Sequence, residues 1–195
     1  IESLTIPSKL EKLNDSWCYD TYKLNKISIV PKNKNFSFFD DKFIIGKSAL
    51  NKEKYDELFF AVRKIKSAFI PDFIEIIGSC AFYGCKKLNR IRFSENSELH
   101  TIGNFAFSNS GIKSIKIPRH VKHIQKNAFT CCEKLDQLEF ESNSELQIIG
   151  MNAFSDSLIQ SISIPSSLTQ IGKGAFSLCF KFHRIDFPPN SNLQI

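Results

Sequence analysis

The six cysteines are the first candidates for chemistry, because thiolates bind metals, form disulfides and act as nucleophiles. Cys85, Cys132 and Cys179 recur at intervals of 47 residues. If each interval holds two stacked repeat units, successive cysteines of this set lie about 9–10 Å apart, which is too far for a disulfide. We therefore expect three buried structural thiols. The other three cysteines show no redox or zinc spacing, so the cysteines leave the redox compartment open.

Two further motifs resemble functional sites only in part. His120-x-x-His123 brings two metal-binding side chains together, but the sequence shows no third ligand converging on them. The tripeptide Gly-Lys-Ser at 46–48 imitates the end of a phosphate-binding loop, yet Asp41 stands where that motif needs its first Gly. The chain also lacks a nucleophile elbow, a His-Glu-x-x-His motif and a paired-carboxylate motif. We expect no catalytic residue, no cofactor and no metal.

Composition and charge set broad limits on the function. Hydrophobic residues make up 42 %, as in ordinary folded proteins, and no apolar run approaches the roughly 20 residues of a membrane-spanning helix. Lys plus Arg number 26 against 20 Asp plus Glu, and no block has the density of a nucleic-acid-binding arm. We therefore expect no membrane segment and do not expect a nucleic-acid partner. Asn14 and Asn35 begin Asn-x-Ser glycosylation acceptors, which favour secretion weakly.

A repeat organises the rest of the chain. An Ala-Phe pair occurs five times, its Phe residues being 25, 22, 25 and 22 apart: Phe82, Phe107, Phe129, Phe154 and Phe176. An Ile stands five residues before each Phe, and Cys and Ser alternate three residues after it. Each unit then ends in a run with apolar residues two apart, which predicts a strand with one buried face. Units this short bury their apolar side chains only by stacking, so we predict a solenoid with the five Phe residues in one interior row.

The repeat also divides the chain. Residues 70–195 contain five regular units and a truncated sixth, residues 1–29 a degenerate N-terminal unit, and residues 30–69 a longer variant unit with an inserted loop or hairpin. A Gly stands four residues before the Phe in four of the five units. Such a Gly indicates either a positive φ or a close approach of two backbones.

The repeat resembles the BspA-like leucine-rich repeats, the subclass typified by treponemal and trichomonad surface proteins. The matching pattern is Pro165-x-x-Leu168-x-x-Ile171-Gly172-x-x-Ala175-Phe176-x-x-Cys179 with the following strand to Phe187. The resemblance implies a leucine-rich-repeat right-handed superhelix, with a parallel β-sheet on the concave face and short turns, helical segments and strands on the other side. It also implies a place at the cell surface.

Side chains that alternate with the buried ones along each strand point outward. Solenoids use such an extended sheet for binding. The predicted protein-binding residues on the concave face are Phe69, Arg90, Arg92, Lys116, Gln137, Glu139, Arg184 and Asp186.

The first hypothesis is a non-catalytic protein-binding module. By resemblance it is a fragment of a cell-surface antigen or adhesin that binds host or neighbouring-cell surface proteins. The alternative is an intracellular scaffold that docks on cytoskeletal or other protein assemblies, for which the free thiols and the mild basic excess fit equally well. A hydrolytic or nucleotide-dependent enzyme built on residues 30–64, and nucleic-acid binding, are weaker alternatives. A glycan on Asn14 or Asn35 would separate the first hypothesis from the scaffold.

Overall fold

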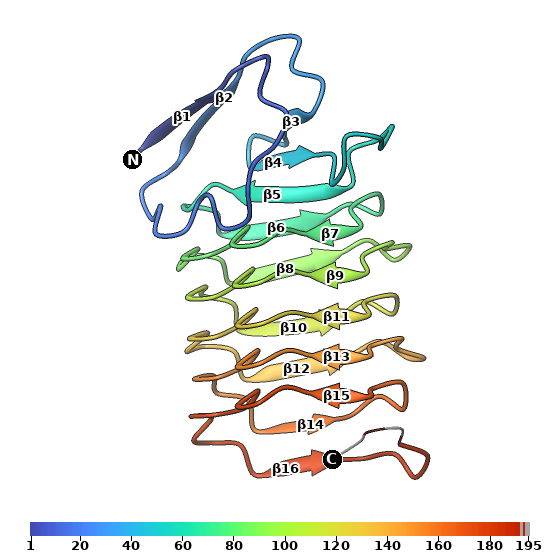
Figure 1. Cartoon of the computed structure of the whole chain (residues 1–195). Helices are drawn as coiled ribbons and strands as arrows, with labels where there is room; N and C mark the ends of the chain where they lie inside the picture. The colour runs from blue at the N-terminus through green and yellow to red at the C-terminus, as the bar shows by residue number, and fades with distance from the viewer. Residues whose placement is uncertain (192, 194–195) are drawn as a thin grey trace.

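The computed structural model describes residues 1–191 and residue 193, and the chain forms a stack of coils (Figure 1). Each regular coil carries one long and one short strand. The long strands are β1 (Ser3–Ile6), β2 (Lys26–Ile29), β6 (Ser67–Ile70), β8 (Arg90–Phe93), β10 (Ser114–Ile117), β12 (Gln137–Phe140), β14 (Ser161–Ser163) and β16 (Arg184–Asp186). The short strands are β7 (Ile76–Ile77), β9 (Thr101–Ile102), β11 (His123–Ile124), β13 (Ile148–Ile149) and β15 (Gln170–Ile171). Between β2 and β6 lie β3 (Phe36–Phe39), β4 (Phe43–Gly46) and β5 (Glu57–Ala61).

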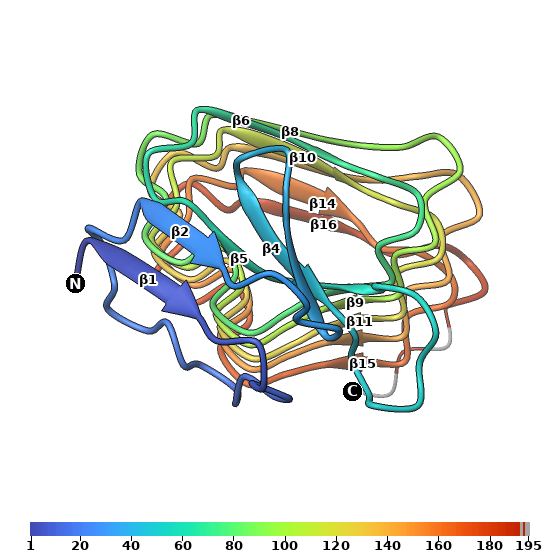
Figure 2. The same ribbon diagram turned by 90° about the horizontal axis from the view of Figure 1, so that it is seen from above.

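The two kinds of strand occupy opposite sides of the coil, as the view along the stack shows (Figure 2). The short strands belong to a continuous sheet with the order β15-β13-β11-β9-β7-β5-β4-β3. Its pairs are parallel from β15 to β5, and β5, β4 and β3 then pair antiparallel. The long strands instead form separate parallel pairs, β1-β2, β6-β8, β10-β12 and β14-β16.

Unit length coincides with the breaks between the long-strand pairs. Partners within a pair are 23 residues apart, as in Ser67 with Arg90. The strands β8 and β10 begin 24 residues apart, as do β12 and β14, and no ladder joins them. The alternation of 25 and 22 in the sequence therefore appears on one side of the coil as paired ribbons and on the other as an unbroken sheet.

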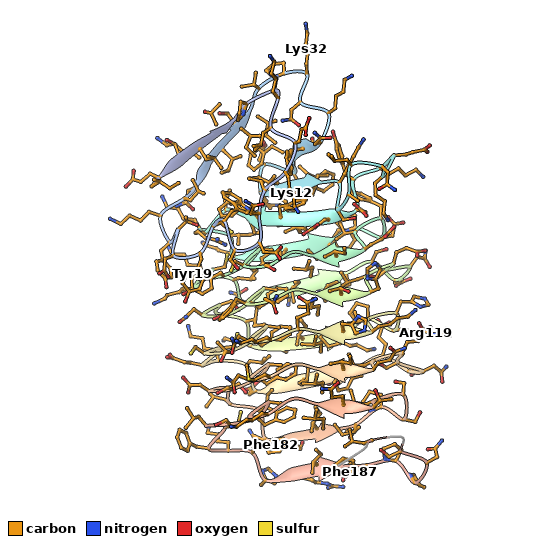
Figure 3. The ribbon with its side chains drawn as sticks, in the orientation of Figure 1. Lys12, Tyr19, Lys32, Arg119, Phe182 and Phe187 are labelled. Atoms are coloured by element: carbon orange, nitrogen blue, oxygen red, sulfur yellow. The ribbon has the colours of Figure 1, made fainter. Side chains whose placement is uncertain are left out.

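The five repeated Phe side chains form the interior row that the repeat predicts. Successive ring centroids are 4.8, 5.0, 5.0 and 5.5 Å apart, and the ring planes are within 7° of parallel. Phe182 of the last coil stacks on Phe176 at 5.0 Å and continues the row (Figure 3). The spacing of the rings matches the distance of about 4.8 Å between strands, so each coil adds one ring to a shared core.

The predicted helical segments are wrong, since no helix occurs among the described residues. The turn that carries Ala-Phe alternates its backbone hydrogen bonds. The N–H of Ala81 donates to Gly78 in the same turn at 3.2 Å, and the N–H of Phe82 donates to Ala106 of the next coil at 2.7 Å. Positive φ angles two residues before and after the Phe, 60° at Cys80 and 67° at Gly84, prevent a helical ladder. No described segment is a helix long and apolar enough to cross a membrane.

The glycines four residues before the Phe are explained by close approach. A Cβ on Gly103 would lie 2.8 Å from the carbonyl oxygen of Ile77, and one on Gly150 would lie 2.6 Å from the carbonyl carbon of Gln125. Neither glycine has a positive φ. The backbone of each coil therefore passes so near its neighbour that a side chain cannot fit.

The right-handed winding stays a prediction, and residues 192, 194 and 195 of the truncated sixth unit lie outside the described residues.

Residues 1–61, called the cap below, are built differently. The strands β1 and β2 pair in parallel one repeat apart and are inclined to the stack, and β3 and β4 form an antiparallel hairpin (Figure 1). The cap buries a second hydrophobic cluster against the first regular turn, with members Ile6, Cys18, Leu24, Phe36, Ile44, Phe60, Cys80 and Tyr83. It thereby covers one end of the stack, which would otherwise expose unpaired strand groups.

Candidate functional site

The outward side chains of β6 to β16 form one surface, called the long-strand face below. The first and third positions of each strand point away from the core. Phe69 is the large apolar residue of this face and is 57 % exposed. The structure places all eight predicted binding residues here, with Asp186 partly buried and the others exposed: Phe69, Arg90, Arg92, Lys116, Gln137, Glu139, Arg184 and Asp186. Their role in binding stays a prediction.

The charge of the long-strand face changes along the stack. Arg90, Arg92 and Lys116 make no ion pair or hydrogen bond with another described residue. At the other end, Arg184 Nε donates to Asp186 Oδ1 at 2.9 Å, so these two charges largely satisfy each other. The unpaired cations on β8 and β10 are therefore the part of the face most available to an acidic partner.

The break between β12 and β14 opens a groove of about 390 Å³ on the same face. Gln137 and Glu139 line one wall, and Ser161 and Ser163 line the other. These side chains offer amide, carboxylate and hydroxyl groups without a nucleophile next to a base. The groove can hydrogen-bond to a partner, and its chemistry is recognition rather than bond breaking.

The repeated cysteines are structural, as expected. Cys132 is fully buried, and its thiol donates to the carbonyl oxygen of Phe107 at 3.1 Å. Ser157 and Cys179, from neighbouring coils, lie 3.2 Å apart between Oγ and Sγ. Burial raises the pKa of the Cys85 thiol to about 11 and that of Cys132 to about 12, so both stay protonated and unreactive. All six cysteines are free thiols.

The other partial motifs have structural partners. His120 Nδ1 lies 3.1 Å from Glu145 Oε1, and the described residues contain no group of three or more side chains able to hold a metal ion. Ser48, from the Gly-Lys-Ser tripeptide, donates from its N–H and its hydroxyl to Asp56 at 2.7 and 2.6 Å. This tripeptide ends β4 and binds the chain itself.

The sequence analysis missed four lysines that gather beside the long-strand face. Lys23, Lys64 and Lys87 each stand three residues before a long strand, and Lys86 is next to Lys87. That shared position was a signal in the sequence. It could not be interpreted without the fold, because the cap brings Lys23 to the stack from about 40 residues away.

The fold and the face define a β-solenoid with an exposed recognition surface. The sequence profile of the BspA type leucine rich repeat region matches residues 52–183 in six copies. The chain therefore belongs to the BspA-type leucine-rich repeat family. Comparison with curated protein sequences finds no match.

Solved structures agree with this membership. The pneumococcal vaccine antigen PcpA is 30 % identical with a TM-score of 0.62, and the match covers 65 % of this chain and 31 % of PcpA. A Treponema pallidum leucine-rich repeat protein is 25 % identical with a TM-score of 0.59, covering 66 % of this chain and 62 % of that protein. A Eubacterium ventriosum leucine-rich repeat protein, at 18 % identity and a TM-score of 0.70, shares the fold over 95 % of this chain and 48 % of its own length. The chain thus spans less than two thirds of each of these proteins.

Proposed function

We propose that this chain is the non-catalytic, protein-binding part of a cell-surface antigen or adhesin. The observation that carries the proposal is the long-strand face, where six successive strands present exposed side chains at equivalent positions. The likeness to PcpA, which is described as a vaccine antigen, supports a place at the surface. The partner is a protein on a host cell or a neighbouring cell.

The proposed mechanism is distributed contact on a rigid surface. The long strands are held from below by the stacked Phe rings and by hydrogen bonds between coils. Because the backbone under the face is already ordered, binding loses little conformational entropy there. The unpaired cations Arg90, Arg92 and Lys116 speed the encounter with an acidic protein surface, and Phe69 offers an apolar contact beside them.

The test is binding of the labelled protein to intact cells. We expect binding that is lost when the cells are first treated with a protease, because the partner is a protein. The triple variant R90E/R92E/K116E should bind at least about tenfold more weakly, with an unchanged melting temperature. The control K122E/K126E/K173E makes the same charge change elsewhere on the coil. Equal loss in both variants, or binding that survives protease treatment, would refute the proposal.

The second candidate is an intracellular scaffold that docks on cytoskeletal or other assemblies. The six free thiols favour it, because secreted proteins commonly use cysteines in disulfides. Asn14 is exposed and therefore accessible to glycosylation. A glycan mass on Asn14 or Asn35 in the native protein supports the surface protein, and unmodified asparagines with a cytoplasmic location support the scaffold.

A further inference from the structure

A basic cleft lies where the cap meets the first coils of the stack. It has a volume of about 510 Å³. Its lining includes five lysines from three different units of the chain: Lys23, Lys26, Lys64, Lys86 and Lys87. Glu2 is the one acidic residue among the lining residues. Five cations therefore share a space that a single carboxylate faces.

The five lysines are not neutralised by the protein. None of them makes an ion pair with another described residue, whereas Lys42 and Lys52 of the cap do. Like charges gathered in one cleft repel one another and lower the stability of the folded state. A chain that keeps such a cluster without counter-charges is arranged for an anion that comes from outside.

A buried guanidinium adds to the positive potential of the cleft. Arg63 is among the lining residues and only 3 % exposed. Its Nη atoms donate to the carbonyl oxygens of Ala81 at 3.0 Å and Cys18 at 3.2 Å. Its buried Nε has no hydrogen-bond partner, and no carboxylate among the described residues pairs with the guanidinium. Water screens a charge so placed less than it screens the surface lysines.

The wall opposite the lysines is aromatic and is built with care for space. Tyr22 is 45 % exposed and lies against Gly84, whose φ is 67°. A Cβ on Gly84 would lie 2.6 Å from the Tyr22 ring, so only Gly lets the ring occupy this position. The hydroxyl of Tyr22 is held by Tyr83 at 2.8 Å and by Asp20 at 2.9 Å. The ring is therefore fixed beside the lysines with part of its surface open.

We infer that this cleft binds a sulfated glycan chain. Lysines are point charges without the planar fork of Arg, so they suit sulfate groups spread along a flexible chain. A fixed aromatic ring next to them offers an apolar surface on which the C–H face of a sugar packs. The inference goes beyond the proposed function, because it concerns a second site and a different class of ligand.

Other polyanions fit the cleft less well. Single-stranded nucleic acid is bound on a series of stacking aromatic rings, and Tyr22 is the one aromatic residue in the lining. A duplex needs a basic surface that follows two strands of phosphates, whereas the lysines here converge on one cleft. An acidic peptide matches the charge but makes no use of the fixed ring.

The test measures binding of a heparin oligosaccharide to the whole chain by calorimetry, with the same oligosaccharide after desulfation as the matched ligand. We expect the sulfated form alone to bind, with an affinity that falls steeply as salt is raised, because binding releases counterions. The variant K64Q/K86Q/K87Q should bind at least about tenfold more weakly, and K122Q/K126Q/K173Q, with the same change in charge, should stay within about twofold. Both variants should keep the melting temperature, since all six lysines are exposed.

Three results would overturn the inference. Equal losses in the two lysine variants would show diffuse attraction without a site. Equal binding of the desulfated oligosaccharide would remove the role of sulfate. Tighter binding of polyglutamate or of oligo-dT than of the sulfated chain would assign the cleft to an acidic peptide or to nucleic acid. The variant R90E/R92E/K116E separates the two sites, because loss of cell binding there bears on the proposed function and leaves the cleft lysines intact.

Discussion

The regular stack and the cap use similar residues in opposite ways. In the stack, the Phe rings are nearly parallel, with an angle of 3° between Phe107 and Phe129. In the cap, rings meet at large angles, 46° between Trp17 and Phe60 and 82° between Phe36 and Phe59. Repetition gives each coil the same contact with its neighbours. The cap instead depends on contacts that occur once.

The difference extends to buried charge. The core of the stack is formed by aliphatic and aromatic side chains with Cys and Ser in one column, whereas the buried charged residues Asp56 and Arg63 lie in and beside the cap. A buried charge is stable only with specific partners, so it fixes one arrangement of the chain. The stack is therefore the rigid support of the long-strand face, and the cap is the part whose position can be changed by single substitutions.

The largest effect is expected in the stack. Phe129→Ala removes the middle ring of the row and leaves a cavity between two coils, which should cost about 3–5 kcal/mol of unfolding free energy. Urea denaturation followed by circular dichroism measures this loss. Phe180→Ala, at a residue that is 88 % exposed, is the control and should change the free energy by less than about 0.5 kcal/mol. A loss below about 1 kcal/mol for Phe129→Ala would contradict the shared core.

A smaller and local effect is expected at the joint between cap and stack. Arg63→Met keeps much of the side-chain volume but removes the donors to the carbonyl oxygens of Cys18 and Ala81, at a cost of about 2–3 kcal/mol. Hydrogen exchange should become faster in residues 14–24 and stay unchanged around Phe129. The neighbouring exposed Lys64→Met is the control. Uniform loss of protection along the whole chain would show that cap and stack are not separable.

A pH-dependent effect is expected in β5 of the cap. Burial, helped by the carboxylates of Asp56 and Asp15, raises the pKa of Glu57 from 4.5 to about 7. The folded state then holds the proton more tightly than the unfolded state, so this contribution to stability is complete below pH 4.5 and is lost as the pH rises through about 7.

Glu57→Gln removes that loss. It should stabilise the protein by about 1–2 kcal/mol at pH 8 and by almost nothing at pH 4.5, as melting curves at the two pH values would show. The exposed Glu53→Gln is the matched control. Stabilisation of equal size at both pH values would mean that the charge of Glu57 is not the cause.

The smallest effect is expected from exchanging the two members of the alternating column. Ser157 lies beside Cys179 and occupies the position that Cys132 holds one unit earlier. Ser157→Cys should change the unfolding free energy by less than about 1 kcal/mol, because both side chains are small and hydrogen-bond within the turn. Thermal melting of the reduced protein measures it. A loss above about 2 kcal/mol would show that each coil has its own packing after all.

The repeat made the core predictable, and it did so because the five Ala-Phe units share one geometry. The absence of helix was not predictable in the same way. The left-handed residues that prevent it include Cys80 and Phe105, which are not the residue types that indicate a positive φ. The glycine pattern left two explanations open, and only the distance from Gly103 to the neighbouring backbone decided between them.

The sites divide along the same line. The outward residues of the long strands could be assigned from period-two alternation alone, whereas the basic cleft depends on contacts between segments far apart in the sequence. Arg63 is joined to Cys18 across 45 residues. Residues 30–69 lack the motif, so nothing in the sequence specifies how the cap folds back on the first coil.

The central claim is that neighbouring coils stabilise one another as a unit, on which a separately held cap rests. Native-state hydrogen exchange in increasing urea tests it most directly, read at the amides of Phe107, Phe129 and Phe154, each bonded to the next coil, and at Leu24 of the cap. The account predicts one common, high opening free energy for the three Phe amides and a lower one for Leu24. Three different values for the Phe amides, or a cap amide that outlasts them, would contradict it.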